Sequence, residues 1–269
     1  MTAVVRSEWL KLRTTSVPWV LTGITLFITG LSILLYFLNH GNSGGGRGGQ
    51  GPDLGFGPPH SGYPHTTQQL RDLLGTGLGS YVFALLLGVL IITTEFRHKT
   101  VTTSFLVTPR RTVFVAGKLV LAALAGAALA LIVLGATLVG GGIALSAKGG
   151  SFPSLVHQLA AVAPGMVLVY VLFALLGVGV GSLITNQVAA IIISLVWFFI
   201  LEPIFGSIWS WLVRWFPSGA ASAASNVTAG RRDAAVGLFN WWQGSLLILA
   251  YGLVFAVIGS FVLTRRDIT

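Results

Sequence analysis

The sequence predicts an all-α membrane protein with six transmembrane helices, and three observations carry that prediction. Hydrophobic residues make up 54% of the 269-residue chain, and charged residues make up only 9%. A soluble domain carries about 25% charged residues, because most of its surface faces water. Six apolar stretches are long enough to cross a bilayer, for which about 20 residues suffice. Basic residues gather beside these stretches, as expected when charge orients a protein in the membrane.

The six predicted spans are Val17–Leu38, Leu73–Thr94, Val113–Leu145, Leu159–Ile184, Val188–Ile208 and Gly244–Leu263. The first span is too long for the apolar core of a cleaved signal peptide, and no small-residue cleavage site follows it cleanly. We therefore expect it to be retained. The third span exceeds the length that one crossing needs, so it must tilt, bend at its glycines or project beyond the bilayer.

The distribution of basic residues predicts that both termini are cytoplasmic. An even number of spans places both termini on one side of the membrane. The inner pieces would then hold Arg6, Lys11, Arg13, Arg97, Lys99, Arg110, Arg111, Lys118, Arg265 and Arg266. The longer outer pieces would hold Arg47, Arg71, Lys148, Arg214, Arg231 and Arg232. Basic residues close to span ends in short loops set orientation, so we expect a multi-pass protein of the cytoplasmic membrane.

The composition also excludes several classes of function. The chain contains no cysteine, which rules out disulfides, thiol catalysis and cysteine metal sites. Its formal net charge of +9 raises the question of nucleic-acid binding. The basic residues lie beside apolar runs rather than along a polar face, so we expect no nucleic-acid partner.

The outer segment 39–72 is predicted to be a flexible loop. Its stretch Asn39–Gln69 is rich in glycine and proline and cannot bury a core. Three histidines in this loop are candidate metal ligands: His40, His60 and His65. Their spacing across glycine matches no metal template, so we favour three solvated histidines and expect no metal site.

The outer segment 209–243, before the last span, has a different composition. Ser207–Phe216 is predicted to be an interfacial helix with three tryptophans at headgroup depth. These are Trp209, Trp211 and Trp215. Ala220–Asn226 is small and polar, and Trp241–Trp242 marks the membrane surface again. Two interpretations stay open for this segment: a plain aromatic belt, or an ordered and partly re-entrant cap.

The search for catalytic motifs finds none. Gly117–Lys118 lacks both the upstream glycine and the following Ser or Thr of a phosphate-binding loop. The chain has no HExxH motif and no pair of carboxylates within its spans. We therefore expect a protein that is not an enzyme and that binds no cofactor or metal of its own.

Two features of the spans allow both a structural and a functional interpretation. Glu202 lies near the outer end of the fifth span, where an ionisable group is a functional candidate by default. We favour a structural role in which Glu202 reaches water or pairs with Arg214. The pairs Gly75–Gly79 and Gly177–Gly181 match GxxxG. This spacing favours close packing within the bundle, with a dimer contact as the alternative.

The inner segment 95–112 is the most informative part of the sequence, because it is the only long cytoplasmic loop. It reads Glu95-Phe-Arg-His-Lys-Thr-Val-Thr-Thr-Ser-Phe-Leu-Val-Thr-Pro-Arg-Arg111, with charge at both ends of a semi-polar middle. Thr100 is placed to cap a short helix that stops before Pro109. Such a helix would lie along the membrane surface and present Phe105 and Leu106 to a partner. An ordinary positive-inside loop is the alternative.

Residues 1–16 are predicted to form an amphipathic helix on the inner membrane surface. Val5, Trp9 and Leu12 share one helical face. Arg6 and Arg13 lie on another face, so the helix has an apolar side for lipid and a basic side for water.

These elements together resemble the ABC-2 type permeases, the membrane subunits of bacterial ABC transporters, most of which are exporters. The resemblance is carried by Ser7-Glu-Trp-Leu-Lys-Leu-Arg13, by Glu95-Phe-Arg-His-Lys-Thr100 and by Thr108-Pro-Arg-Arg111. In topology it covers the whole chain, 1–269, as a single transmembrane domain. The shared order is an amphipathic first helix, six spans, a long inner loop after the second span and a structured outer segment before the sixth.

The resemblance implies a permease that pairs with a second copy or a homologous permease, above two copies of a separate ATPase subunit. ATP and magnesium would bind to that ATPase, because this chain lacks a nucleotide-binding domain. The loop after the second span would supply a coupling helix that docks on the ATPase. Its coupling residues would be Glu95, Arg97, Lys99, Thr100, Phe105, Leu106, Pro109, Arg110 and Arg111. The amphipathic helix with Val5, Trp9 and Leu12 would be a connecting helix that also contacts the ATPase.

The expected function is therefore transport of a substrate, in the outward direction, with ATP hydrolysed by the partner. An apolar cavity lining indicates a hydrophobic or amphiphilic substrate. Two other classes stay open: a channel or ion-driven secondary transporter, and a membrane anchor subunit without transport activity. Secondary transporters usually carry polar residues or helix breaks at mid-membrane, and the predicted spans contain almost none, which argues against that class.

Overall fold

The structure is a computed structural model in which residues 15–41, 67–97, 111–147, 152–184, 186–225, 227 and 237–265 are described. All regular secondary structure in these ranges is helical, which confirms the predicted all-α class. The long helices are α2 (Ser16–Gly41), α4 (Tyr81–Arg97), α6 (Arg111–Ala147), α7 (Phe152–Leu183) and α12 (Trp241–Arg265). The short elements are α3 (Thr67–Gly75), η1 (Leu78–Ser80), α8 (Gln187–Val196), η2 (Trp197–Leu201), α9 (Glu202–Ile208), η3 (Ser210–Trp215) and α10 (Pro217–Ser225).

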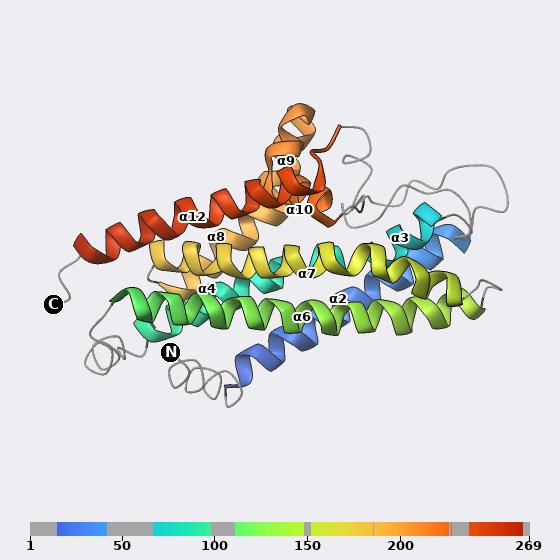
Figure 1. Cartoon of the computed structure of the whole chain (residues 1–269), viewed down its shortest axis with the longest axis horizontal. Helices are drawn as coiled ribbons and strands as arrows, with labels where there is room; N and C mark the ends of the chain where they lie inside the picture. Colours follow the sequence, from blue (N-terminus) through green and yellow to red (C-terminus); the bar gives the residue numbers. More distant parts are fainter. Residues whose placement is uncertain are drawn as a thin grey trace.

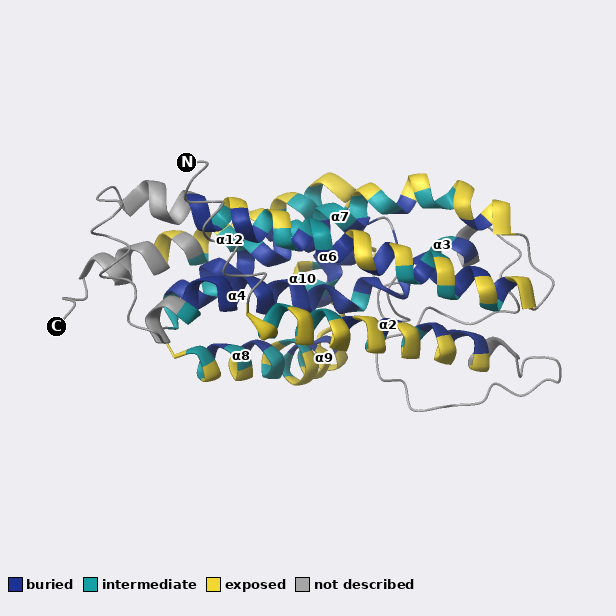
Figure 2. Cartoon of the chain, turned by 90° about the horizontal axis from the view of Figure 1, so that it is seen from below, coloured by how far each residue is buried: buried dark blue, intermediate teal, exposed yellow. Residues whose placement is uncertain are grey.

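The helices α6 and α7 run along the whole length of the bundle, and the others cover one half or the other (Figure 1). At one end, α4, α8 and α12 lie beside them, and α2 and α3 lie towards the other end. The short helices α9 and α10 lie near the middle of the long axis, where α12 begins (Figures 1 and 2). The chain therefore turns back at α9–α10 well before it reaches the far end of α6 and α7.

The core of the bundle is built around α7, which makes its most extensive contacts with α4, α12 and α6. Backbone contact between α4 and α7 is very close. A Cβ atom at Gly177 would overlap the carbonyl oxygen of Leu85, and one at Gly88 would overlap that of Ala174. Gly181 faces Ile92 and Val89 on the same helix α4. The GxxxG pair Gly177–Gly181 is thus used for packing inside the chain, as its default interpretation predicted.

Five helical stretches are long and apolar enough to cross a membrane, which indicates a membrane protein. They are Ser16–Leu38, Leu70–Thr94, Gly117–Ala147, Phe152–Leu183 and Gln187–Ile208. The last helix, α12, is 25 residues long, and the apolar part that is described extends over Trp241–Phe255. Apolar side chains cover the outward sides of α2, α8 and α9, whereas α4 and α10 are buried (Figure 2). An outer surface of this kind suits lipid rather than water.

The third predicted span is one continuous helix, α6, of 37 residues. At 1.5 Å per residue, such a helix is about 55 Å long, well beyond the roughly 30 Å of a hydrocarbon core. The glycines therefore do not interrupt the helix. The helix must tilt or project beyond the bilayer.

The second predicted span, Leu73–Thr94, lies within an apolar helical stretch long enough to cross a membrane, but this stretch is not one continuous α-helix. The helix α3 ends at Gly75, a turn and the 3-10 helix η1 follow, and α4 begins at Tyr81. Buried polar groups bond around this break. The hydroxyl of Tyr170 donates to the carbonyl oxygen of Gly77 over 2.6 Å. The hydroxyls of Thr29 and Ser80 lie 3.2 Å apart.

Irregular backbone at membrane depth is tolerated only where the protein satisfies it, and the bond from Tyr170 to the carbonyl of Gly77 does so. The bundle thus contains an interrupted helix and buried hydroxyls, whereas the sequence suggested almost no polar residues or helix breaks at mid-membrane. Thr25, Thr29, Ser80 and Thr137 are all buried in the bundle. Two of these hydroxyls bond to backbone carbonyls of their own helices, Thr25 to Leu21 and Thr137 to Val133 and Leu134. A hydroxyl satisfied in this way does not prevent an apolar helix from forming, so the hydropathy pattern does not reveal it.

The fifth predicted span is divided by a π-helical turn, η2, between α8 and α9. Pro203 has no backbone N–H, and its ring would clash with the carbonyl of Phe199 in a regular α-helix. The backbone widens just before it, so the N–H of Glu202 donates to the carbonyl oxygen of Trp197, five residues back. Single π-turns of this kind occur often at functional sites. Here the turn leads directly into the segment that folds back into the bundle.

Candidate functional site

The predicted coupling residues fall mostly outside the described ranges. Lys99, Thr100, Phe105, Leu106, Pro109 and Arg110 lie in the segment 98–110, and Val5, Trp9 and Leu12 lie in 1–14. Glu95 and Arg97 belong to the end of α4, and Arg111 begins α6, with their side chains outside the description. Of the three histidines, His60 and His65 also lie outside it. These assignments therefore stay predictions, and the described site residues are others.

The first described site joins the two helices that flank the predicted coupling loop. Lys118 on α6 is 1% exposed, and its ammonium group donates to the carbonyl oxygen of Ile91 on α4 over 2.9 Å. Leu121 and Ala122 on the next turn of α6 are also buried. Both partners lie within about two helical turns of the residues where α4 ends and α6 begins. Lys118 therefore links α4 to α6 close to the helix ends that the predicted coupling loop connects.

The second described site is the segment after η2, which folds back into the bundle as α9, η3 and α10. The predicted interfacial helix Ser207–Phe216 is not a single helix. The helix α9 ends at Ile208, and the 3-10 helix η3 follows. The three tryptophans Trp209, Trp211 and Trp215 are exposed, as a position at an interface requires.

The helix α10 is buried almost completely, although its sequence is short and built of small residues. Its neighbours are glycines on two long helices. A Cβ atom at Gly165 of α7 would come 2.6 Å from the Cα of Ser225, and one at Gly244 of α12 would come 2.6 Å from the carbonyl oxygen of Ala220. The small residues of α10 and these two glycines let three backbones approach closely. Of the two open interpretations, this packing favours an ordered element over a plain aromatic belt.

Glu202 is buried, which corrects the expectation that it reaches water. Only 5% of the residue is exposed, and its Oε1 accepts the backbone N–H of Ser218 over 2.8 Å. Ser218 lies in the first turn of α10, so the carboxylate caps that helix and meets the positive end of its dipole. Arg214, the partner that the sequence suggested, lies against the rings of Trp215 and Phe239, at 5.9 and 5.8 Å from their centroids. The side chain of Glu202 therefore joins α9 to α10.

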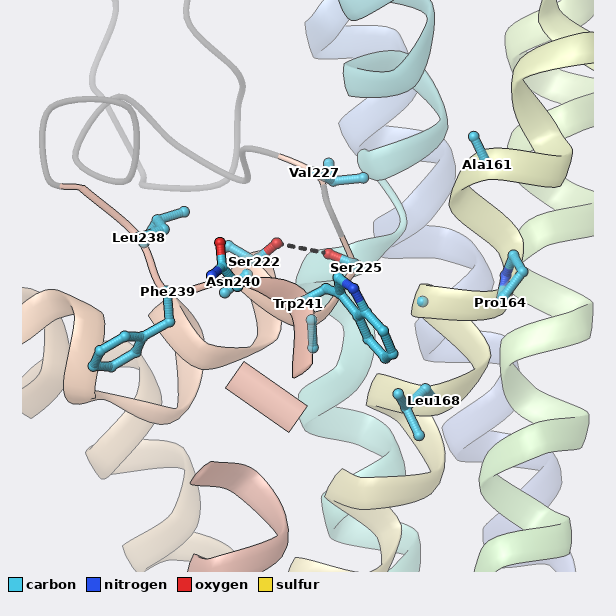
Figure 3. A pocket seen from close by; sticks show the side chains of 13 residues that line it. Ala161, Pro164, Leu168, Ser222, Ser225, Val227, Leu238, Phe239, Asn240 and Trp241 are labelled. Carbon is cyan, nitrogen blue, oxygen red and sulfur yellow. Dashed lines mark hydrogen bonds between the residues drawn. The ribbon is translucent and has the colours of Figure 1, made fainter. Parts of the chain in front are cut away.

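A pocket of about 540 Å³ opens beside the C-terminal end of α10. Figure 3 shows Ala161, Pro164 and Leu168 of α7 on one side, and Ser222, Ser225, Asn240 and Trp241 on the other. Pro164 lies inside α7 and leaves the carbonyl of Ala160 without its helical N–H partner. The lining therefore combines apolar side chains, an indole ring, hydroxyls and an amide. A pocket of this size and mixed character suits an amphiphilic molecule.

The site offers no metal-binding arrangement in the described ranges, where no group of three His, Cys, Asp or Glu side chains is close enough to share an ion. Comparison with protein-family models and with curated proteins finds no match for this chain.

Two functional candidates, Lys118 and the α10 packing, were missed in the sequence. Lys118 lies inside the apolar stretch Val113–Leu145, and a lysine within a predicted span is itself a signal. It was counted with the orientation charges because it is close to the span end. The small-residue run at 217–225 carried no comparable signal, since only tertiary contact shows what it packs against.

Proposed function

We propose that this chain is the permease subunit of an ABC transporter of the ABC-2 type, which moves a hydrophobic or amphiphilic substrate outward. A separate ATPase subunit, present in two copies, supplies the ATP hydrolysis, and a second copy or a homologous permease completes the membrane part. The chain crosses the cytoplasmic membrane six times, with α12 as the sixth span and both termini inside. The resemblance of the two inner elements to that family is the first support for this proposal.

The observation that carries the proposal is the hydrogen bond from the ammonium group of Lys118 to the carbonyl oxygen of Ile91. A coupling loop transmits force only if its two arms are anchored in a rigid base. The segment 98–110 connects α4 directly to α6, and the two helices are bonded just inside that connection. A loop that merely joined two spans would need no buried charge at its base, because burying an ammonium group is costly.

A continuous set of close contacts leads from this base to the pocket. The helix α4 is in backbone contact with α7 at Gly88 and Gly177. The helix α7 in turn contacts α10 at Gly165, beside the pocket. Packed helices of this kind move as rigid units, so a shift of α4 and α6 would change the pocket. The mixed lining of the pocket supports an amphiphilic substrate.

The experiment that tests the function replaces the two apolar residues of the predicted coupling helix with acidic ones. The variant Phe105→Glu/Leu106→Glu is expressed with a candidate ATPase subunit, sought among the neighbouring genes, and purified in detergent. We expect co-purification of the ATPase and permease-stimulated hydrolysis both to fall at least about tenfold, as when apolar anchors of an interface are replaced by charge. The matched control is Leu54→Glu/Phe56→Glu, the same change in the predicted outer loop, which should leave both unchanged.

The two readouts together decide the coupling assignment. If the Phe105/Leu106 variant binds and stimulates the ATPase like the unaltered chain, the coupling assignment is wrong. If the unaltered chain itself neither binds nor stimulates the ATPase, the ABC proposal fails as a whole, and the membrane-anchor class is favoured when no transport is seen either.

The broken second span favours one alternative function, a channel or ion-driven secondary transporter. Interrupted helices with polar groups at the break are typical substrate or ion sites of such proteins. Here the break at 76–80 is surrounded by the hydroxyls of Thr29, Ser80 and Tyr170. Transport into proteoliposomes distinguishes the two: an ABC permease needs ATP and its partner, whereas a secondary transporter works with an ion gradient alone.

A further inference from the structure

We propose that Lys118 is a positioning residue that transmits movement of the 95–112 loop to the spans. This inference rests on the proposed function and adds a mechanical part to it. In this role the ammonium group does not touch substrate or nucleotide. It keeps the inner ends of α4 and α6 in one fixed register, so that both helices move together when the loop is displaced.

The burial of Lys118 is the first argument. The residue is among the largest fully buried side chains in the bundle. An ammonium group in such a place costs free energy, because it leaves water for an apolar interior. A lysine here is therefore a poor choice for stability alone. The presence of Lys118 is better explained by a role in fixing the position of α6 relative to α4.

The geometry of the bond is the second argument. The ammonium group reaches across to the backbone of the facing helix, at the carbonyl oxygen of Ile91, over 2.9 Å. A bond to a main-chain atom fixes the position of α4 itself rather than of one of its side chains. Apolar contacts between two helices permit small sliding movements, whereas a charge-assisted hydrogen bond has a defined length and direction. The bond therefore resists sliding of α6 along α4.

The place of the bond is the third argument. It lies between the loop and the glycine contact of α4 with α7, where Gly88 and Gly177 bring the backbones together. Displacement of the loop therefore acts on α4 and α6 in the turn where α4 also meets Gly181 of α7. If the two helices slide past each other, part of the displacement is lost at this point.

The test uses three variants of the full chain, each purified with the ATPase. Lys118→Met removes the charge at similar size, and Lys118→Arg retains it. Thr137→Val is the matched control, because Thr137 is a buried polar residue of the same helix that bonds only within it, to Val133 and Leu134. For each variant we measure ATPase co-purification, permease-stimulated hydrolysis and the melting temperature in detergent.

For Lys118→Met we expect wild-type co-purification and melting temperature, with stimulated hydrolysis reduced about tenfold, which corresponds to about 1.4 kcal/mol of coupling. Lys118→Arg should recover part of the stimulation, and Thr137→Val should behave as the unaltered chain. Wild-type stimulation by Lys118→Met overturns the inference. Equal loss of melting temperature and stimulation also overturns it, since that result indicates a structural role.

If Lys118→Met fails to accumulate in the membrane, Lys118→Gln replaces it, because glutamine keeps a polar side chain but lacks the charge and the reach with which lysine bonds to the carbonyl of Ile91. Reduced stimulation with normal co-purification then supports the inference, and unchanged stimulation overturns it. Failure of the proposed function looks different. In that case the unaltered chain does not bind the ATPase, and no comparison among the Lys118 variants is reached.

Discussion

The carboxylate of Glu202 accepts the backbone N–H of Ser218 over 2.8 Å, and this bond links two short helices that fold back into the bundle. The acceptor lies on α9 and the donor in the first turn of α10. A helix of small residues has little apolar surface of its own to hold it in place. The cap from α9 therefore adds to the close packing on α7 and α12 that positions α10 beside the pocket.

Replacing Glu202 with alanine should destabilise the protein. The first turn of α10 would lose an acceptor in a buried site, at a cost of roughly 1–2 kcal/mol, as for other helix caps. Thermal unfolding in detergent measures the effect. Ser207→Ala on α9 is the control, because Ser207 is exposed and bonds only to Ile204 of its own helix. Equal melting temperatures for the two variants would show that the cap contributes nothing.

Replacing Gly177 with alanine should disrupt the contact between α4 and α7. The added methyl group would overlap the carbonyl oxygen of Leu85, so the helices must move apart at a cost of about 1–3 kcal/mol. Gly135→Ala on α6 is the matched control, since its added methyl group meets open space. That control should be neutral or stabilise by about 0.5–1 kcal/mol, because alanine favours helix over glycine. Melting curves that do not separate the two variants would contradict the packing described.

Removing the Tyr170 hydroxyl should loosen the break in the second span. The variant Tyr170→Phe loses the bond to Gly77, and we expect faster amide hydrogen exchange at residues 76–81. Tyr251→Phe is the reciprocal control, because the hydroxyl of Tyr251 donates to the carbonyl oxygen of Trp215. It should speed exchange near η3 and leave 76–81 unchanged. Identical exchange profiles would mean that neither hydroxyl holds its segment.

The orientation of the chain in the membrane can be measured by labelling single introduced cysteines, because the chain has no cysteine of its own. Ser43→Cys in the predicted outer loop should react with a membrane-impermeant thiol reagent on intact cells. Thr103→Cys in the predicted inner loop should react only after the membrane is opened. The reverse labelling pattern would show that the termini are outside and would remove the basis for an ATPase partner.

Filling the pocket should impair handling of the substrate without affecting assembly. Ala161→Trp places an indole among the lining residues, whereas Ala160→Trp changes the neighbouring residue of the same helix, which lies outside the lining. We expect the first variant to lower substrate-stimulated ATP hydrolysis several-fold, as occlusion of a binding site does, with normal ATPase co-purification. The second should retain stimulation. If both variants respond to substrate equally, the pocket is not on the transport route.

The positions of the spans could be predicted from the sequence because hydropathy reports burial in lipid directly. The stretch Val17–Leu38 became α2, and the excessive length of the third span became a continuous α6. The break in the second span was passed over, because the mean hydropathy of Leu73–Thr94 is high despite the glycines and hydroxyls at 75–80, and the hydroxyls of Thr29 and Tyr170 come from elsewhere in the chain. Such bonds depend on which helices become neighbours, and hydropathy carries no information on that.

The ionisable residues show the same limit. Glu202 was recognised as unusual, but its partner is a backbone N–H of α10, which has no signature in the sequence. Lys118 was read as an orientation charge because it lies near a span end, and its partner is a carbonyl of another helix. Main-chain partners are invisible to motif searches, since every residue supplies the same groups.

The dominance of α7 in the core has a consequence for biogenesis. The earlier helices α2, α4 and α6 contact one another less than α4 and α6 contact α7. During synthesis these helices therefore enter the bilayer before the surface that will join them exists. The face of α4 around Gly88, which later packs on α7, therefore remains exposed to lipid until α7 has left the ribosome. A truncated nascent chain that stops at Ala147 should thus remain a loose set of helices open to insertion chaperones, and one that extends past Leu183 should lock together.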